Sequence, residues 1–145
     1  MYKKILVPLN GSKNAEVVLP HVVEMANGRN TEIVLLRVSI PPEINLIAED
    51  PECVQYSHPD TEVQCRDYLQ HIASSLETQG VHTTIRIGRG APDDVILKTA
   101  KELKPDVIVV SKRKGQHLLH TMHGCVAEKI LHKAEMPVLL IEAPN

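Results

Sequence analysis

The sequence predicts an α/β fold: a doubly wound, five-stranded parallel sheet covered by helices on both faces. Apolar runs and amphipathic helical stretches alternate along all 145 residues, as in chains built from repeated β–α units. The first, second and fourth runs show no polar alternation, which is typical of strands buried on both faces. Right-handed crossovers leave few arrangements, and we expect the order 3-2-1-4-5 with four helices. The length predicts a single domain over residues 1–145.

Each predicted element depends on a short-range pattern. Strands are runs rich in Val, Ile and Leu, and helices are longer stretches whose apolar side chains recur every three or four positions. In chain order, the predicted elements are strand 4–9, helix 15–26, strand 33–38, helix 65–76, strand 81–87, helix 95–103, strand 107–110, helix 126–134 and strand 138–141. The apolar runs are far shorter than the roughly 20 residues that a membrane-spanning helix needs, so we expect no membrane association.

Turn and breaker residues mark the boundaries of these elements. Asn10-Gly11 closes the first strand, and Pro20 predicts a kink in the first helix because proline has no backbone N–H to donate. The longest irregular stretches are 40–60, which holds four prolines, and the basic, His-rich connection 112–123. Connections of such length are usually functional or mobile.

Composition excludes several classes of partner. Lys plus Arg number 16 and Asp plus Glu 18, and a net charge of −2 lacks the basic surplus of a general nucleic-acid binder. Three tyrosines, with no Phe or Trp, are too few to stack single-stranded nucleic acid. The cysteines at 53, 65 and 125 are scattered and odd in number, which favours a reducing compartment over a disulfide framework. We therefore expect a cytoplasmic protein.

A ligand crevice is expected at one edge of the predicted sheet. In open sheets of this kind, ligands bind beyond the carboxyl ends of the strands where the winding direction reverses. With the predicted order, that point lies between the ends of the first and fourth strands. One wall of the crevice would hold Pro8 and Asn10, and the other Val110 and Ser111.

Several stretches of the chain resemble the universal stress protein family. The similar stretches are residues 5–12, 15–16, 36–38, 90–92, 105–110, 124–131 and 136–141. Together they extend over essentially the whole chain. The resemblance implies a Rossmann-like fold similar to the adenine nucleotide alpha hydrolases and a stress-response role through ligand or partner binding. It also implies a homodimer formed through the last strand, whose apolar edge needs cover.

The phosphate-binding motif of that family is altered in this sequence. Nucleotide-binding members carry G-x2-G-x9-G-[S/T] after the fourth strand, and Ser111 and Lys114 stand at the first two glycine positions here. Gly124 is kept, Cys125 stands in place of Ser or Thr, and Asn10 replaces an Asp in the first turn. Glycine lets backbone N–H groups approach phosphate oxygens, so these changes weaken a triphosphate cradle. We expect weak ATP binding.

Two main functions stay open at this point. The first is a stress-response protein that binds a ligand or partner and is not an enzyme, because no catalytic constellation is present. The second is an adenine-nucleotide binder for ATP or AMP, with slow ATP hydrolysis left open. Its candidate binding residues are Pro8, Asn10, Val38, Val110, Ser111, Lys114, Gly124, Cys125 and Val126. Val38 and Val110 would hold a base between apolar walls, and Lys112 or Lys114 would meet phosphate.

Metal or thiol sensing is a third hypothesis. His117, His120 and His123 recur every three residues, but this spacing matches no standard zinc signature, so we expect no resident metal. Cys125 precedes the last predicted helix, where the partial positive charge of a helix start favours a thiolate. A small residue filling a turn is the alternative interpretation of this cysteine.

Overall fold

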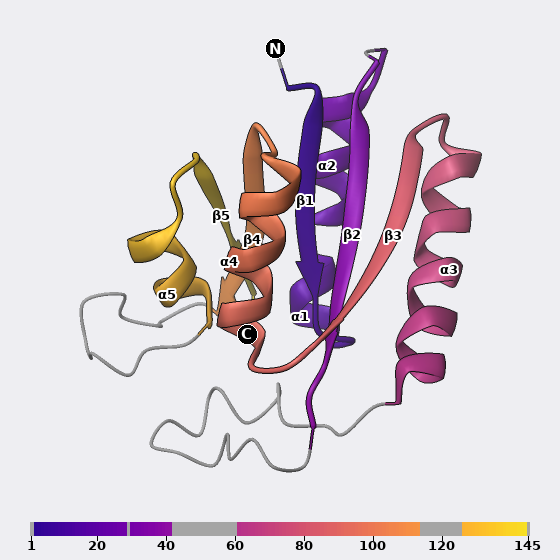
Figure 1. The fold of residues 1–145 in the computed structure, drawn as a ribbon. Coiled ribbons are helices and arrows are strands. Elements are labelled where there is room, and N and C mark those ends of the chain that lie inside the picture. Colours follow the sequence, from indigo (N-terminus) through magenta and orange to yellow (C-terminus); the bar gives the residue numbers. More distant parts are fainter. Residues whose placement is uncertain (1, 29, 42–60, 114–125, 145) are drawn as a thin grey trace.

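The computed structural model of the protein describes residues 2–28, 30–41, 61–113 and 126–144. They form a parallel sheet in the order β3-β2-β1-β4-β5 (Figure 1). The strands are β1 (Lys4–Leu9), β2 (Glu32–Ser39), β3 (His82–Arg89), β4 (Val107–Arg113) and β5 (Val138–Ala143). The helices are α1 (Lys13–Glu16), α2 (Leu19–Ala26), α3 (Glu62–Thr78), α4 (Pro92–Leu103) and α5 (Val126–Lys133). The predicted fold class and strand order are confirmed.

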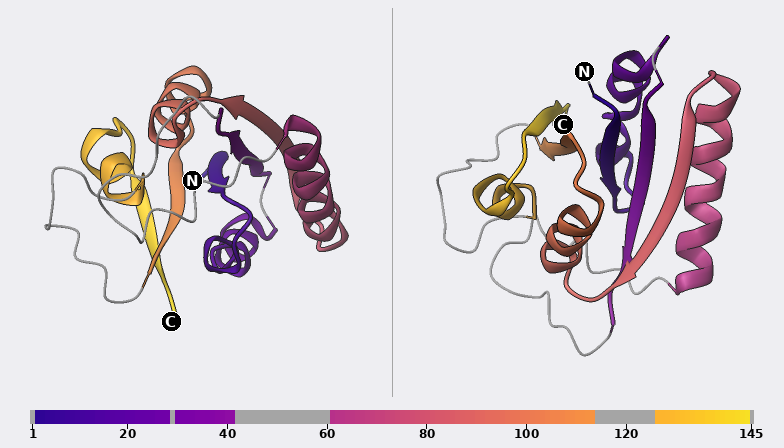
Figure 2. Two further views of the ribbon diagram at one scale, coloured as in Figure 1. Left: turned by 90° about the horizontal axis from the view of Figure 1, so that it is seen from below. Right: turned by 45° about the horizontal axis from the view of Figure 1, so that its top comes forward.

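The helices divide between the two faces of the sheet. Helices α1, α2 and α3 cover one face, and α4 and α5 cover the other (Figure 2). Successive side chains of β1 therefore enter different cores: Ile5 and Val7 pack with α1–α3, whereas Leu6 packs with α4 and α5. Among the described residues, no helix is both long and apolar enough to cross a membrane.

The first predicted helix is broken into α1 and α2. Pro20, near the start of α2, has no N–H to donate to the carbonyl of Glu16, so the helical hydrogen bonds stop there. They resume with the N–H of Val22, which donates to the Val18 carbonyl at 2.9 Å. The predicted kink is confirmed, and α1 with α2 corresponds to one of the four predicted helices.

Strand β4 extends farther than its apolar run. Lys112 and Arg113 pair in register with Glu142 and Ala143 of β5, and Lys112 Nζ donates to Glu142 Oε2 at 2.9 Å. The prediction that the basic connection begins at residue 112 was therefore wrong, because sheet pairing continues into this polar segment. Most of both predicted long connections, at 42–60 and 114–125, lies outside the described residues.

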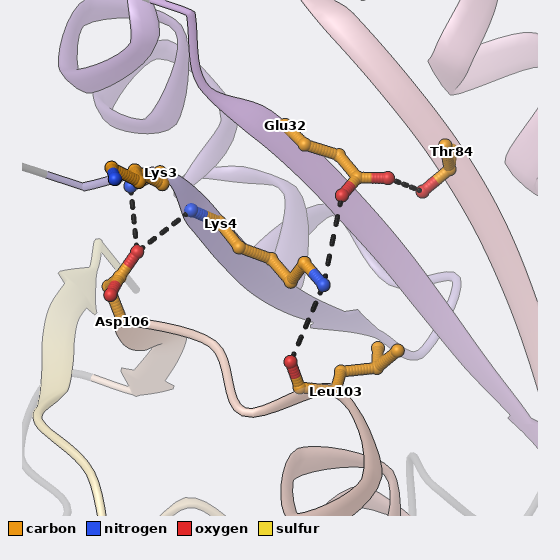
Figure 3. A network of polar contacts seen from close by, with 6 residues as sticks. All are labelled: Lys3, Lys4, Glu32, Thr84, Leu103 and Asp106. Carbon is orange, nitrogen blue, oxygen red and sulfur yellow. Dashed lines mark hydrogen bonds and ion pairs between the residues drawn. The ribbon is translucent and has the colours of Figure 1, made fainter.

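A polar network links the strands at their amino ends. Asp106 Oδ2 accepts hydrogen bonds from the backbone N–H groups of Lys3 and Lys4, at 2.7 and 3.0 Å (Figure 3). Lys4 Nζ lies 4.0 Å from Glu32 Oε1, and Glu32 Oε2 accepts a 3.2 Å bond from Thr84. The network thus joins the starts of the neighbouring strands β3, β2, β1 and β4.

Replacing Asp106 tests the electrostatic part of this network. Its two backbone hydrogen bonds, led by that from Lys3, hold the pKa of the Asp106 carboxyl below its usual range. The ionised form therefore contributes stability above the unfolded-state pKa, and this contribution is lost as pH falls through the lowered folded-state pKa. We expect Asp106→Ala to lower Tm at pH 7 and to differ less from wild type as pH falls from about 5 to about 2. Asp67→Ala, on the exposed side of α3, is the control; an equal Tm loss at every pH would contradict the prediction.

Candidate functional site

A pocket opens at the carboxyl ends of β1 and β4, where the connecting helices change from one face of the sheet to the other. Its volume is about 600 Å³, including the space at its open mouth. Its lining residues come from the ends of β1, β2 and β4 and from α1, α4 and α5. Because the strands are parallel, their carboxyl ends lie on the same side of the sheet. The strand order predicts a ligand crevice on this side.

Both predicted walls of the crevice meet in this pocket. The predicted binding residues that line it are Pro8, Asn10, Val38, Val110, Ser111 and Val126. Other predicted residues lie outside the described part of the chain, namely Lys114, Gly124 and Cys125 of the nucleotide hypothesis and His117, His120 and His123 of the metal hypothesis. The role of the altered glycine motif beyond Ser111 stays a prediction.

The pocket passes around the end of β1 and contacts both cores. Leu9 and Ala15 belong to the core under α1–α3, whereas Leu36 and Val110 belong to the core under α4 and α5. Most of its wall is aliphatic, so an apolar part of a ligand would be held by burial and packing instead of aromatic stacking.

Some pocket residues were not selected by the sequence patterns. Helical periodicity predicts Ile96 as a core residue, but it also forms part of the pocket wall, as does Ile130. Arg37 is a polar residue of the pocket lining that the sequence patterns did not indicate. The signal that would have found it is a charged residue inside an otherwise apolar strand, because an arginine is rarely buried without a partner or a role.

Asn10 shapes the turn that leads from β1 into α1. Its Oδ1 accepts a hydrogen bond from the backbone N–H of Ser12 at 2.9 Å. Ser12 Oγ then accepts from the N–H of Ala15 at 3.1 Å, which caps the start of α1. Asn10 is thus a lining residue of the pocket whose side-chain oxygen supports the backbone of the turn, and its NH2 group can donate two hydrogen bonds.

Arg37 is a buried cation near the end of β2, with 5% of its surface exposed. Its guanidinium carbon lies 5.1 Å from the centre of the Tyr68 ring on α3, a cation–π contact. The Tyr68 hydroxyl donates a 2.7 Å hydrogen bond to Glu16 Oε2 at the end of α1. Burial, followed by the hydrogen bond to Glu16, holds the pKa of Tyr68 above its ordinary value, so the hydroxyl stays a donor.

Gly11 gives the Arg37 guanidinium its space. Gly11 adopts a φ of +87°, and a Cβ atom at this position would collide with Arg37 Nη1 and lie 3.0 Å from Arg37 Cζ. The guanidinium group therefore contacts the Tyr68 ring and also packs against the turn that carries Asn10. This cluster joins α1, β2 and α3 to the rim of the pocket.

An open parallel sheet with a pocket where its winding reverses defines the class of Rossmann-like α/β ligand-binding proteins. Within this class, a sequence model of the universal stress protein family matches residues 1–142. The chain belongs to the universal stress protein family.

Known proteins of this family are similar over the full chain. The universal stress protein MJ0577 of Methanocaldococcus jannaschii is 28% identical over 160 residues, which cover 100% of this chain and 98% of that protein. The solved structure of MJ0577 has a TM-score of 0.77 and covers 100% of this chain and 99% of that one. A universal stress protein in complex with cAMP has a TM-score of 0.71 at 18% identity, with 97% of each chain covered. A family protein from Arabidopsis thaliana with AMP bound has a TM-score of 0.67 at 23% identity, covering 97% and 92% of the two chains.

Gly11→Ala tests the packing of Arg37 against the turn. The added methyl group combines the strain of a positive φ with a collision with a buried guanidinium. Gly28→Ala is a matched control, because Gly28 also has a positive φ, +69°, but its Cβ would meet nothing within 4 Å. We expect Gly28→Ala to lower the free energy of unfolding by about 1–2 kcal/mol and Gly11→Ala to lower it by at least about 1 kcal/mol more. Urea denaturation measures both, and equal losses would contradict this packing.

Proposed function

We propose that this universal stress protein acts by binding a small ligand in the pocket between β1 and β4, with no catalytic step assigned to it. The pocket itself is the observation that carries the proposal. It lies at the strand ends where the winding of the sheet reverses, and its wall combines aliphatic side chains with a few polar groups, as in small-molecule sites. A stress-response role through ligand binding agrees with membership of the family.

A nucleotide with one phosphate is the ligand class that we favour. Pro8, Val38 and Val110 offer aliphatic surfaces to a purine base. The two family structures described above hold AMP and cAMP, each of which carries a single phosphate. Ser111 and Lys114 replace motif glycines, which weakens a triphosphate cradle more than a site for one phosphate. We therefore expect AMP to bind more tightly than ATP.

Calorimetric titration with AMP and ATP tests this assignment, together with Val38→Ala. Loss of two methyl groups from the wall should weaken AMP binding by up to about fifteenfold, since burial of each such group contributes about 0.8 kcal/mol. Val63→Ala is the control, because Val63 is 68% exposed on α3. AMP at a hundred times its Kd should stabilise the wild-type protein by about 2.7 kcal/mol. No stabilisation by either nucleotide would reject the nucleotide proposal.

We also propose that the protein forms a homodimer through β5. This strand is at one edge of the sheet, next to β4 (Figure 1). Leu139 is 38% exposed there, and Ile141 is only partly buried. An apolar strand edge of this kind is stabilised when a second copy covers it, and twofold symmetry would cover both edges at once.

Leu139→Lys tests the dimer. The added charge would have to be buried in an interface, so we expect the variant to elute as a monomer under conditions where the wild-type protein is a dimer. Val63→Lys adds the same charge on α3, beside the opposite edge of the sheet, and should leave the mass unchanged. Light scattering coupled to size-exclusion chromatography measures both. A monomeric wild-type protein, or a dimeric Leu139→Lys variant, would contradict the proposed interface.

The compartment that we propose is the cytoplasm. Cys65 supports this assignment because it is a free thiol, fully buried on the inner face of α3, where it packs as a small apolar side chain. A reducing environment keeps such a thiol free, in agreement with the scattered positions of the cysteines in the sequence.

A further inference from the structure

Strand β1 separates from β4 before either strand ends. Its pairing with β4 stops at Leu6, which lies in register with Ile108, whereas its pairing with β2 continues to Leu9. Strand β4 in turn stays paired with β5 as far as Arg113. The winding of the sheet sends the connections beyond the strand ends to opposite faces, but it does not require two continuing strands to part. The separation therefore has a local cause just after Leu6.

The backbone of β1 faces its two neighbours alternately. The carbonyl of Lys3 accepts a hydrogen bond from β2, and that of Lys4 accepts one from Asp106, just before β4, each at 2.9 Å. The N–H and C=O of one strand residue point to the same side, and those of the next residue point to the other, so the even-numbered residues of β1 face β4. After Leu6, the next residue that would donate to β4 is therefore Pro8.

The facing groups on β4 follow from the same alternation. Ile108 donates its N–H to the carbonyl of Pro137, on the β5 side, at 2.9 Å, so Val109 and Ser111 face β1. In a continued register, an N–H at position 8 would donate to the Val109 carbonyl, and the Ser111 N–H would donate to the carbonyl of position 8. Within the described residues of the two strands, the pairing ends before both of these bonds.

A proline at position 8 prevents this pairing. Pro8 has no N–H, and its ring carries a carbon where the hydrogen would be, so the Val109 carbonyl cannot approach to hydrogen-bond distance. The strands then part, which also takes the Ser111 N–H away from the Pro8 carbonyl. The pocket begins at this level, where residues of both strands line it, namely Pro8, Leu9, Val110 and Ser111.

We propose that Pro8 holds the pocket open by preventing β1 from pairing with β4 beyond Leu6. Pro8 is thus a positioning residue for the ligand, in addition to the aliphatic surface that it offers. An N–H at this position would let the strands close, and a ligand would then have to break the new hydrogen bonds in order to bind. The effect on binding rests on the proposed function, whereas the effect on strand pairing does not depend on a ligand.

Amide hydrogen exchange, followed by NMR in Pro8→Val and Pro8→Ala, tests the pairing without a ligand. Both changes restore an N–H at position 8, and Pro8→Val keeps a branched aliphatic side chain in the pocket wall. We expect the new N–H to be protected and that of Ser111 to exchange at least about tenfold more slowly than in the wild-type protein, because both then bond between strands. The N–H of Val110, which faces β5, should exchange as before.

Pro20→Ala is the matched control, because it restores an N–H in an exposed residue that does not line the pocket. It should leave exchange at Ser111 unchanged. Rapid exchange at position 8 with an unchanged rate at Ser111 would overturn the proposal, since the strands would then stay apart without the proline. Failure of both Pro8 variants to fold would also overturn it, because added strand pairing should raise Tm.

Titration with AMP measures the consequence for binding. We expect both Pro8 variants to bind AMP at least about fivefold more weakly than the wild-type protein, as for two hydrogen bonds of low net strength that the ligand must break. Pro20→Ala should bind as the wild-type protein does. An unchanged affinity in Pro8→Val would overturn the positioning role, whatever Pro8→Ala shows. If the wild-type protein does not bind AMP, the nucleotide proposal fails, and the exchange rates still decide whether Pro8 separates the strands.

Discussion

Parallel hydrogen bonding of β1 to strands on both of its sides is the constraint on which the rest of the molecule depends. Strand β1 pairs with β2 along its whole length and with β4 at Ile5 and Leu6. The helices that follow β1 and β2 cover one face, and those that precede and follow β4 cover the other. The connections that leave the ends of β1 and β4 therefore go to opposite faces, and the pocket forms between these strand ends.

The amino ends and the carboxyl ends of the strands carry different kinds of side chain. At the amino ends of the strands, the Asp106 carboxylate and the Lys4 ammonium bind backbone and side-chain groups of neighbouring segments. These contacts help to fix the register of the strands. At the carboxyl-terminal edge, aliphatic side chains surround an open volume, and the buried charge of Arg37 lies beside it. The groups that stabilise the sheet and the groups that line the pocket thus lie at opposite ends of the strands.

Most elements of the fold follow from local patterns in the sequence. Uninterrupted apolar runs identify the buried strands, and Pro20 predicts the break between α1 and α2 because the missing N–H is a local property. The extension of β4 through Lys112 and Arg113 does not follow, since polar residues enter a strand only when a neighbour such as β5 supplies hydrogen bonds. Strand ends are therefore less predictable than strand centres.

The sequence by itself determined the α/β class, the strand order, the resemblance to the universal stress proteins and the two walls of the pocket. These features depend on periodicity, turn residues and chain connectivity, which are properties of residues that lie close together in the sequence. Only the tertiary structure decided the environment of Arg37. Tyr68 and Glu16 are 52 positions apart, and they meet Arg37 and Gly11 only because α1, β2 and α3 pack together. Contacts between such distant residues arise from packing, and no local pattern encodes them.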